Sequence, residues 1–212
     1  LPITVQEELD RVMPVIDELA GDDMVLSIDT RNAETMRQAT KAGAALINDV
    51  TALTDDPETL KVASESDAMI CLMHMQGRPQ TMQNNPVYDD VVRDVINFLK
   101  DRIEACAQEG VDASRIIIDP GIGFGKTLEH NLTLFKNLDR LGELDVPLLL
   151  GASRKSFIEK ICGATPPDQR LPGSLAACLW GWQKGTKIFR VHDVAETSQA
   201  LEVWKALSGA QA

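Results

Sequence analysis

The sequence contains six short apolar segments, and each is followed by a stretch with helical periodicity. The segments are residues 24–30, 45–50, 68–75, 115–121, 147–153 and 187–193. Runs of Val, Ile and Leu without polar alternation are typical of strands that are buried on both faces of a parallel sheet. Helices between such strands supply the crossovers that parallel pairing requires. The sequence therefore predicts an α/β fold made of repeated strand–helix units.

Polar side chains follow every one of the six predicted strands, which distinguishes between two α/β architectures. An open doubly wound sheet binds its ligand at one switch point, so only a few strand ends need polar residues. A barrel brings all of its strand ends to one mouth. The pattern favours a (β/α)8 TIM barrel. The polar residues are Asp29 and Thr30, Asn48 and Asp49, His74 and Gln76, Asp119, Ser153 to Lys155, and Arg190, His192 and Asp193.

The predicted units recur about every 32 residues, so eight of them would need about 256 residues, close to the roughly 250 of a typical barrel. The chain has 212 residues and begins with a predicted helix, residues 4–20. We therefore expect the first two strands and their loops to be missing from this chain. No linker rich in Gly, Ser or Pro interrupts it, which predicts a single domain over residues 1–212, incomplete at its N-terminus.

Composition excludes several classes of function. The formal net charge is −11 and the basic residues are scattered, so we expect neither nucleic acid nor a membrane surface as a partner. No apolar run approaches the roughly 18 residues of a membrane span. The four cysteines are far apart and form no C-x-x-C pair, which indicates free thiols and a cytoplasmic protein.

Three polar residues at strand ends, Asp29, Asn48 and Asp119, form the first candidate binding group. Carboxylates accept hydrogen bonds from N–H groups, and an amide both donates and accepts. Together the three could bind a flat heterocycle with an amidine-like edge. Each alone could instead cap a helix or complete a hydrogen bond in the core.

Two further groups carry positive charge. Residues 153–156, Ser-Arg-Lys-Ser, open a predicted helix, where hydroxyls and cations suit an anion or an electron-rich carbonyl. Arg190 and His192 alternate on the last predicted strand and should point the same way, as expected for binding phosphate or pyrophosphate. The alternatives are a solvated charged turn for the first group and a structural ion pair, for example with Asp193, for the second.

The glycine-rich segment PGIGFGKT, residues 120–127, does not match a nucleotide-binding motif. A Walker A loop needs glycine where Pro120 stands, and a dinucleotide fingerprint needs glycine where Lys126 stands. The glycines still allow a ligand to approach the backbone closely. His74 lies between two methionines with no nearby second ligand, so we expect a structural role for His74 and an apolar wall from Met73.

Seven strings across the whole chain resemble bacterial dihydropteroate synthases, members of the pterin-binding TIM-barrel family, and occur in that family's order. The strings Met-His-Met-Gln-Gly and Ser-Arg-Lys-Ser are specific in combination. The seven are SIDT (27–30), INDV (47–50), CLMHMQGRPQTMQ (71–83), IDPGIGFGKT (118–127), LLGASRKSFI (149–158), RLPGSLA (170–176) and RVHDV (190–194).

The resemblance implies a transferase of folate biosynthesis, in a family targeted by sulfonamides. Such an enzyme condenses 6-hydroxymethyl-7,8-dihydropterin pyrophosphate with p-aminobenzoate, giving 7,8-dihydropteroate and pyrophosphate. It also implies Mg²⁺ as cofactor and a homodimer. The family's metal-contacting Asn belongs to a loop expected to be missing, so no metal ligand is predicted within this chain.

The resemblance also implies roles for individual residues. The catalytic residues would be Lys155, Arg190 and His192, of which Arg190 and His192 hold pyrophosphate. The p-aminobenzoate contacts would be Ser156, Phe124 and Lys155. The pterin contacts would be Asp29, Asn48, Met73, Asp119, Phe124, Gly151, Lys155 and Arg190.

Two alternatives remain open at the level of sequence. One is a related barrel that transfers a methyl group from methyltetrahydrofolate to a corrinoid. The strings around Lys155 and Arg190 argue against it, because that reaction releases no pyrophosphate. The other is a non-catalytic fragment that only binds pterin.

Overall fold

The computed structural model describes residues 3–21, 23–78 and 81–209. Residues 1 and 2, and residues 79 and 80 of the string at 71–83, lie outside the described residues. By their internal contacts, the residues form two compact units. Unit 1 comprises residues 1–74 and 97–118, and unit 2 comprises residues 75–96 and 119–212. A single domain can contain more than one such unit, so one domain over residues 1–212 stays a prediction.

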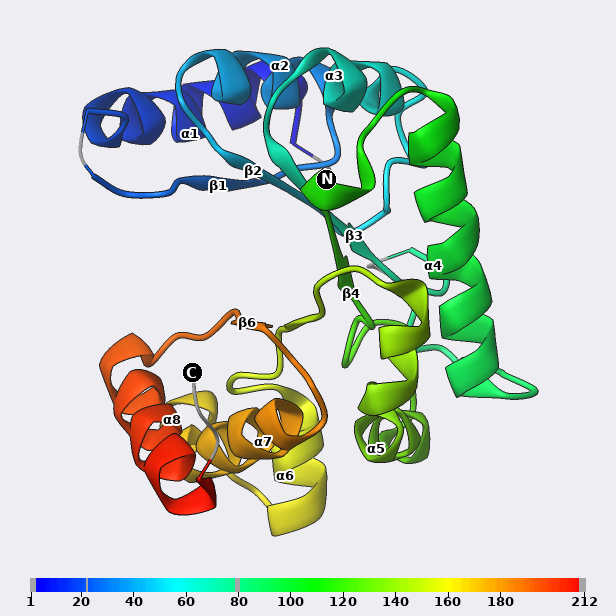
Figure 1. The fold of residues 1–212 in the computed structure, drawn as a ribbon, viewed down its shortest axis with the longest axis vertical. Coiled ribbons are helices and arrows are strands. Elements are labelled where there is room, and N and C mark those ends of the chain that lie inside the picture. Colours follow the sequence, from blue (N-terminus) through cyan, green and yellow to red (C-terminus); the bar gives the residue numbers. More distant parts are fainter. Residues whose placement is uncertain (1–2, 22, 79–80, 210–212) are drawn as a thin grey trace. The chain divides into compact units, whose positions relative to one another are not determined.

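Unit 1 is a parallel sheet with helical crossovers. Its strands are β1 (Ser27–Asp29), β2 (Leu46–Asp49), β3 (Met69–Met73) and β4 (Ile116–Asp119), in that spatial order, with Asp119 itself counted in unit 2. Its helices are α1 (Val5–Leu19), α2 (Ala33–Lys41), α3 (Thr59–Glu65) and the C-terminal part of α4 (Val91–Gln108). Figure 1 shows α2 and α3 on one face of β1 and β2.

The core of unit 1 consists of the apolar strand residues that the sequence marks. Ile47, Ile70, Leu72 and Ile116 are fully buried. Strand register pairs Asp29 with Asn48, so these two residues end neighbouring strands side by side. The parallel strands predicted from the sequence are confirmed, although each is shorter than its apolar segment.

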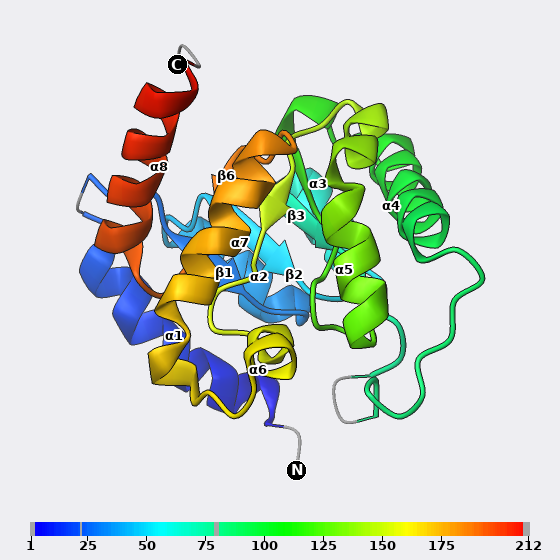
Figure 2. The ribbon, with the colours of Figure 1, turned by 90° about the horizontal axis from the view of Figure 1, so that it is seen from below.

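Unit 2 continues the alternation with shorter strands. Its helices are the N-terminal part of α4, α5 (Leu128–Lys136), α6 (Ser156–Cys162), α7 (Leu171–Gln183) and α8 (Val194–Ser208), and α7 packs on α8 (Figures 1 and 2). Strands β5 (Leu149–Leu150) and β6 (Ile188–Phe189) pair in parallel. A Cβ on Gly181 of α7 would lie 2.6 Å from Leu150 Cδ2, so glycine lets α7 pack closely on β5.

The elements differ from the sequence-based expectations mainly at their ends. Residues 153–156 are expected to open a helix, and α6 begins only at Ser156, because Arg154 has a left-handed backbone with φ of 57°. Helix α5 is followed by a 3-10 segment, Leu138–Leu144. Within the described residues, none of the helices has the length and apolar character that crossing a bilayer requires.

Candidate functional site

Asp29 and Asn48 form a hydrogen-bonded pair at the carboxyl ends of β1 and β2. Asn48 Nδ2 donates to Asp29 Oδ2 over 3.0 Å. Asn48 is 7% exposed, whereas Asp29 is exposed. The contact fixes the orientation of the Asn48 amide, and the exposed carboxylate can accept hydrogen bonds from a ligand.

Met73 ends β3 in the same unit, and His74 follows it. Met73 is 3% exposed and packs in the core of the unit, and its role as an apolar wall stays a prediction. His74 is buried, and its ring packs edge-on against Phe98 with centroids 5.0 Å apart. This packing fits the structural role expected for His74.

In unit 2, the side chains of Asp119, Lys155 and Arg190 converge on Gly151. A Cβ placed on Gly151 would lie 3.5 Å from Asp119 Oδ2, and 4.0 Å from both Lys155 Nζ and Arg190 Cβ. Any side chain at position 151 would therefore occupy the space into which a carboxylate and an ammonium project. The structure brings together four of the residues predicted for pterin binding.

Burial dominates the electrostatics of this group. It raises the pKa of Asp119, which is 4% exposed, while Lys155, the Gly121 amide, Lys126 and Arg190 act to lower it. Burial also lowers the pKa of Lys155 to about 8, with Asp119 acting to raise it and Arg190 to lower it further. Lys155 is therefore poised to change its charge close to neutral pH.

Lys155 is held by the loop that follows β4. Its Nζ donates to the carbonyl oxygen of Ile122 and lies 4.6 Å from the ring centroid of Phe124, a cation–π distance. The amide of Gly121 donates to Asp119 Oδ1 over 2.7 Å. The glycine-rich segment thus orients the carboxylate, the ammonium and an aromatic ring, which a merely flexible turn would not do.

Lys126 is a feature of this loop that sequence reasoning missed. It is 1% exposed, and its Nζ donates to the carbonyl oxygens of Gly121 and Phe124, each over 3.0 Å. Burial lowers its pKa to about 7. In the sequence, Lys126 is notable only because it stands where a dinucleotide-binding fingerprint needs glycine. No local pattern indicates that a lysine after a glycine is buried.

His192 follows the last strand, β6, and has Ser153 as its neighbour. His192 Nδ1 lies 3.0 Å from Ser153 Oγ, and the His192 amide donates to the same oxygen over 3.3 Å. Both Arg190 and His192 are exposed and lie beyond β6, which ends at Phe189. The sequence predicts that the two side chains point the same way because residues alternate along a strand. Since neither residue lies in a strand, alternation does not support that prediction.

Asp193 forms its ion pair with Arg154, through both nitrogen atoms Nε and Nη2 of the guanidinium. This hydrogen bonding lowers the pKa of Asp193. Next to Arg154, Lys155 is the N-cap of α6 and the exposed Ser156 is the first residue of that helix. The ion pair ties the segment carrying Lys155 and Ser156 to the segment carrying His192.

Comparison with known proteins decides the family. The family model described as "Pterin binding enzyme" matches residues 2–192. The chain is 44% identical over 209 residues to the dihydropteroate synthase of Haemophilus influenzae, covering 98% of this chain and 75% of that protein. It is 46% identical over 207 residues to that of Neisseria meningitidis serogroup C, covering 97% and 73%.

The chain belongs to the dihydropteroate synthase family. Among solved structures, the Yersinia pestis dihydropteroate synthase with a sulfonamide drug complex superposes with a TM-score of 0.95 at 41% identity, covering 99% of this chain and 76% of that one. The Xanthomonas albilineans dihydropteroate synthase in complex with 7,8-dihydropteroate gives a TM-score of 0.91 at 45% identity, covering 99% and 79%.

Membership of the dihydropteroate synthase family confirms three predictions from the sequence. The family resemblance is correct, and so is the class of function, that of an enzyme and a transferase. The fold class is that of the (β/α)8 barrel shared by this family. The roles of individual residues are not decided by these likenesses.

Proposed function

We propose that this chain joins 6-hydroxymethyl-7,8-dihydropterin pyrophosphate to p-aminobenzoate, releasing 7,8-dihydropteroate and pyrophosphate. The observation that carries the proposal is the convergence of Asp119, Lys155 and Arg190 on Gly151. A carboxylate suits the N–H groups of a pterin, an ammonium suits its carbonyl, and a guanidinium suits a diphosphate. Solved relatives support it, since one holds 7,8-dihydropteroate and another holds 4-aminobenzoic acid.

For pterin binding, we assign the acceptor roles to the carboxylates of Asp29 and Asp119 and to the amide of Asn48. Lys155 donates to the pterin carbonyl. Met73 and Phe124 supply apolar surface for the ring, and Gly151 leaves the space that the ring edge needs. Burial of Asp119 and Asn48 supports these roles, because each hydrogen bond is stronger where water is excluded.

The reaction then needs three changes, two at the pterin methylene carbon and one at the amine nitrogen that attacks it. Its bond to the diphosphate oxygen breaks, the amine nitrogen of p-aminobenzoate forms a new bond to the carbon, and that nitrogen loses a proton. Arg190 and His192 stabilise the negative charge that develops on the departing diphosphate. Ser156, with Phe124 and Lys155, contacts p-aminobenzoate. This assignment gives alkyl transfer to an arylamine as the subclass of transferase.

Magnesium belongs to the proposal only through the family resemblance. Mg²⁺ prefers a shell of oxygen ligands and usually reaches an enzyme together with phosphate groups. The described residues contain no group of three or more His, Cys, Asp or Glu side chains that could hold a metal ion. None of their side chains is therefore assigned to the metal.

We further propose a cytoplasmic homodimer. All four cysteines are free thiols, which supports a reducing compartment. Apolar residues exposed on α8 support association, since Val203 is 54% exposed and Leu207 is 80% exposed, and both line a groove between α7 and α8. Sedimentation equilibrium of the purified chain tests the dimer directly.

The catalytic proposal is tested by incubating the purified chain with both substrates and Mg²⁺. Release of pyrophosphate that depends on p-aminobenzoate is the expected result. Asp119→Asn should weaken pterin binding by about 1–3 kcal/mol, whereas Asp139→Asn, at an exposed carboxylate that pairs with Lys184, should not. Pterin binding without turnover would favour the non-catalytic alternative. Methyl transfer to a corrinoid without pyrophosphate release would favour the methyltransferase alternative.

A further inference from the structure

Glu8 of α1 is a buried charged residue that the proposed reaction does not use. It is 9% exposed and belongs to the first turns of a helix whose other charged residues face solvent. A carboxylate this deeply buried must be compensated by several donors, because removing it from water is costly. Its partners therefore indicate what it is for.

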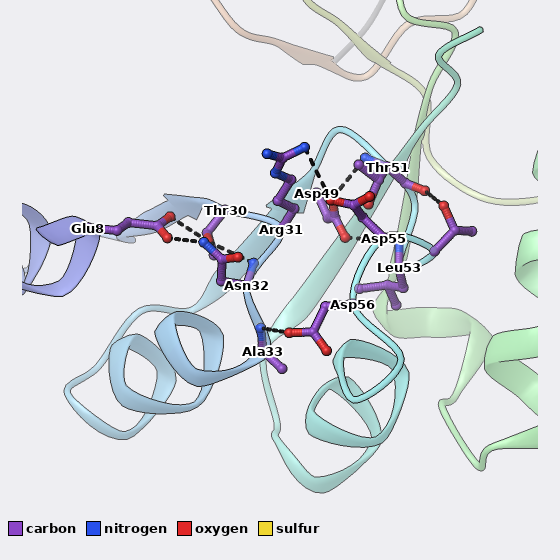
Figure 3. Close-up of polar contacts among 11 residues, drawn as sticks. Glu8, Thr30, Arg31, Asn32, Ala33, Asp49, Thr51, Leu53, Asp55 and Asp56 are labelled. Atoms are coloured by element: carbon purple, nitrogen blue, oxygen red, sulfur yellow. Dashed lines mark hydrogen bonds and ion pairs between the residues drawn. The ribbon is translucent and has the colours of Figure 1, made fainter. Parts of the chain in front are cut away.

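The donors to Glu8 all come from the segment that directly follows Asp29. Thr30 Oγ1 donates to Glu8 Oε1 over 2.6 Å, and the Asn32 side-chain amide donates to Glu8 Oε2. Thr35 Oγ1 donates to the same Oε2 over 3.1 Å. Figure 3 shows the carboxylate of Glu8 pointing from α1 toward Thr30 and Asn32. One side chain thus holds the turn between β1 and α2.

Thr30 transmits this contact to the end of β1. The Thr30 hydroxyl also accepts from the backbone amide of Asn32 over 3.1 Å. The backbone amide of Thr30 donates to the carbonyl oxygen of Asn48 over 3.2 Å. Thr30 is 5% exposed and adjoins Asp29 in the chain. The position of Thr30 therefore fixes the backbone from which the Asp29 carboxylate projects toward Asn48.

Weaker contacts hold the other side of the same turn. Arg31 pairs with Asp55 at 3.1 Å, where both side chains are more than a third exposed, and the Ala33 amide donates to Asp56 Oδ2 over 2.9 Å (Figure 3). An exposed ion pair contributes little to stability. The buried contacts of Glu8 are therefore the stronger constraint on this turn.

We propose that Glu8 is a positioning residue for pterin binding, holding Thr30 and Asn32 so that Asp29 and Asn48 keep the geometry the pterin needs. This inference rests on the proposed function, because it assigns Glu8 a part in binding one of the two substrates. It acts through the turn, not through contact with the ligand. Loss of the Glu8 carboxylate then affects pterin more than p-aminobenzoate.

The test is Glu8→Gln, with Glu7→Gln as the matched control on the same helix. Glu7 is exposed, and its carboxylate pairs with Arg11. Glutamine keeps the size of Glu8 but leaves one acceptor oxygen for three donors. We expect the KM for pterin pyrophosphate and the calorimetric Kd for pterin to rise about tenfold in Glu8→Gln. The KM for p-aminobenzoate should change less than twofold, and Glu7→Gln should match the wild type.

A purely structural role would give a different pattern. It would lower the melting temperature and the fraction of active protein, and hence the apparent kcat, while leaving both KM values unchanged. That result in Glu8→Gln overturns the inference and leaves the proposed function intact. A wild-type chain that binds no pterin overturns both.

A second pair of variants keeps the inference testable if Glu8→Gln does not fold. Thr30→Val removes the hydroxyl that Glu8 accepts from and keeps the shape of the side chain, whereas Thr30→Ser retains the hydroxyl. We expect Thr30→Val to weaken pterin binding about tenfold and Thr30→Ser to remain within twofold of wild type. Equal pterin affinity in the two variants overturns the inference.

Discussion

Arg102 of α4 donates a hydrogen bond from its guanidinium Nε to the carbonyl oxygen of Ala52, in the loop after β2, over 2.8 Å. Ala52 and Leu53 both have left-handed backbones, with φ of 54° and 61°, which side chains with a Cβ adopt at a cost. Asp49, fully buried, accepts from the amides of Thr51 and Leu53 in the same loop. Two charged side chains therefore stabilise a strained loop next to Asn48 (Figure 3 shows the Asp49 contacts).

Arg102→Ala should destabilise the chain by about 1–3 kcal/mol, because the Ala52 and Leu53 carbonyl oxygens lose their charged donor. Urea unfolding measures the change. Lys100→Ala on the same helix is the control, since Lys100 is exposed and its distance to Glu104 is 3.9 Å, so its effect should stay within about 0.5 kcal/mol. Equal effects of the two variants would contradict the role given to Arg102.

Gly125 of the glycine-rich loop should tolerate no side chain. Its φ is 60°, and a Cβ there would lie 2.3 Å from the carbonyl oxygen of Gln76. Gly110 has a φ of 88°, but a Cβ added to it would meet no atom within 4 Å, so Gly110 isolates the cost of backbone strain. We expect Gly110→Ala to cost about 1 kcal/mol and Gly125→Ala to cost clearly more, in thermal or urea unfolding. A smaller loss of stability in Gly125→Ala than in Gly110→Ala would argue against the close approach of the Gln76 carbonyl oxygen to Gly125.

Most of the strand–helix order could be predicted from the sequence, because buried parallel strands are apolar runs and polar residues mark their ends. That pattern alone predicts that Asp29, Asn48 and Asp119 lie at strand ends, and the structure puts them there. The element ends were less predictable. Arg154 has a left-handed backbone that delays the start of α6. Distant residues stabilise it, since its amide donates to Ser174 Oγ and its carbonyl oxygen accepts from Arg170.

The burial of two charged residues, Glu8 and Lys126, could not be predicted from the sequence, and the reason is the same for both. Glu8 belongs to a helical pattern in which acidic residues normally face solvent, and Lys126 follows a glycine in a loop. What buries each of them is a set of hydrogen-bonding partners brought near by folding, such as Thr30 for Glu8 and Gly121 for Lys126. Partners of this kind cannot be inferred from local periodicity.

Lys126 should make stability depend on pH just above neutrality. Its pKa is lowered from 10.5 to about 7 by burial, so between these values the unfolded chain binds one proton more than the folded chain. The free energy of unfolding should therefore rise with pH in this window, by up to about 1.4 kcal/mol per pH unit. Lys126→Met should flatten the rise between about pH 7 and pH 8.5 in urea unfolding, and Lys136→Met, at an exposed lysine of α5, should not. An unchanged slope in Lys126→Met would show that another group titrates there.

Lys155 should make pterin binding depend on pH in the opposite direction. Burial, with Arg190 adding to its effect, lowers the pKa of Lys155 to about 8. Raising the pH through this value removes the charge that would strengthen the proposed hydrogen bond from Lys155 to the pterin carbonyl. We expect calorimetry between about pH 7 and pH 9.5 to show pterin affinity falling roughly tenfold with a midpoint near 8. Lys155→Arg should bind more weakly throughout but lose this dependence, because a guanidinium stays charged.

Lys160→Arg, at an exposed lysine of α6, the helix that Lys155 caps, is the control for Lys155→Arg and should keep the wild-type pH profile. The comparison separates the charge of Lys155 from a general effect of arginine on α6. If Lys155→Arg kept the same midpoint, the titrating group would be another one, and the ammonium of Lys155 would not be the donor to the pterin carbonyl. If affinity in the wild type did not change over this range, the proton on Lys155 would not contribute to binding, although its placement beside Asp119 and Gly151 would still leave it room to contact the ring.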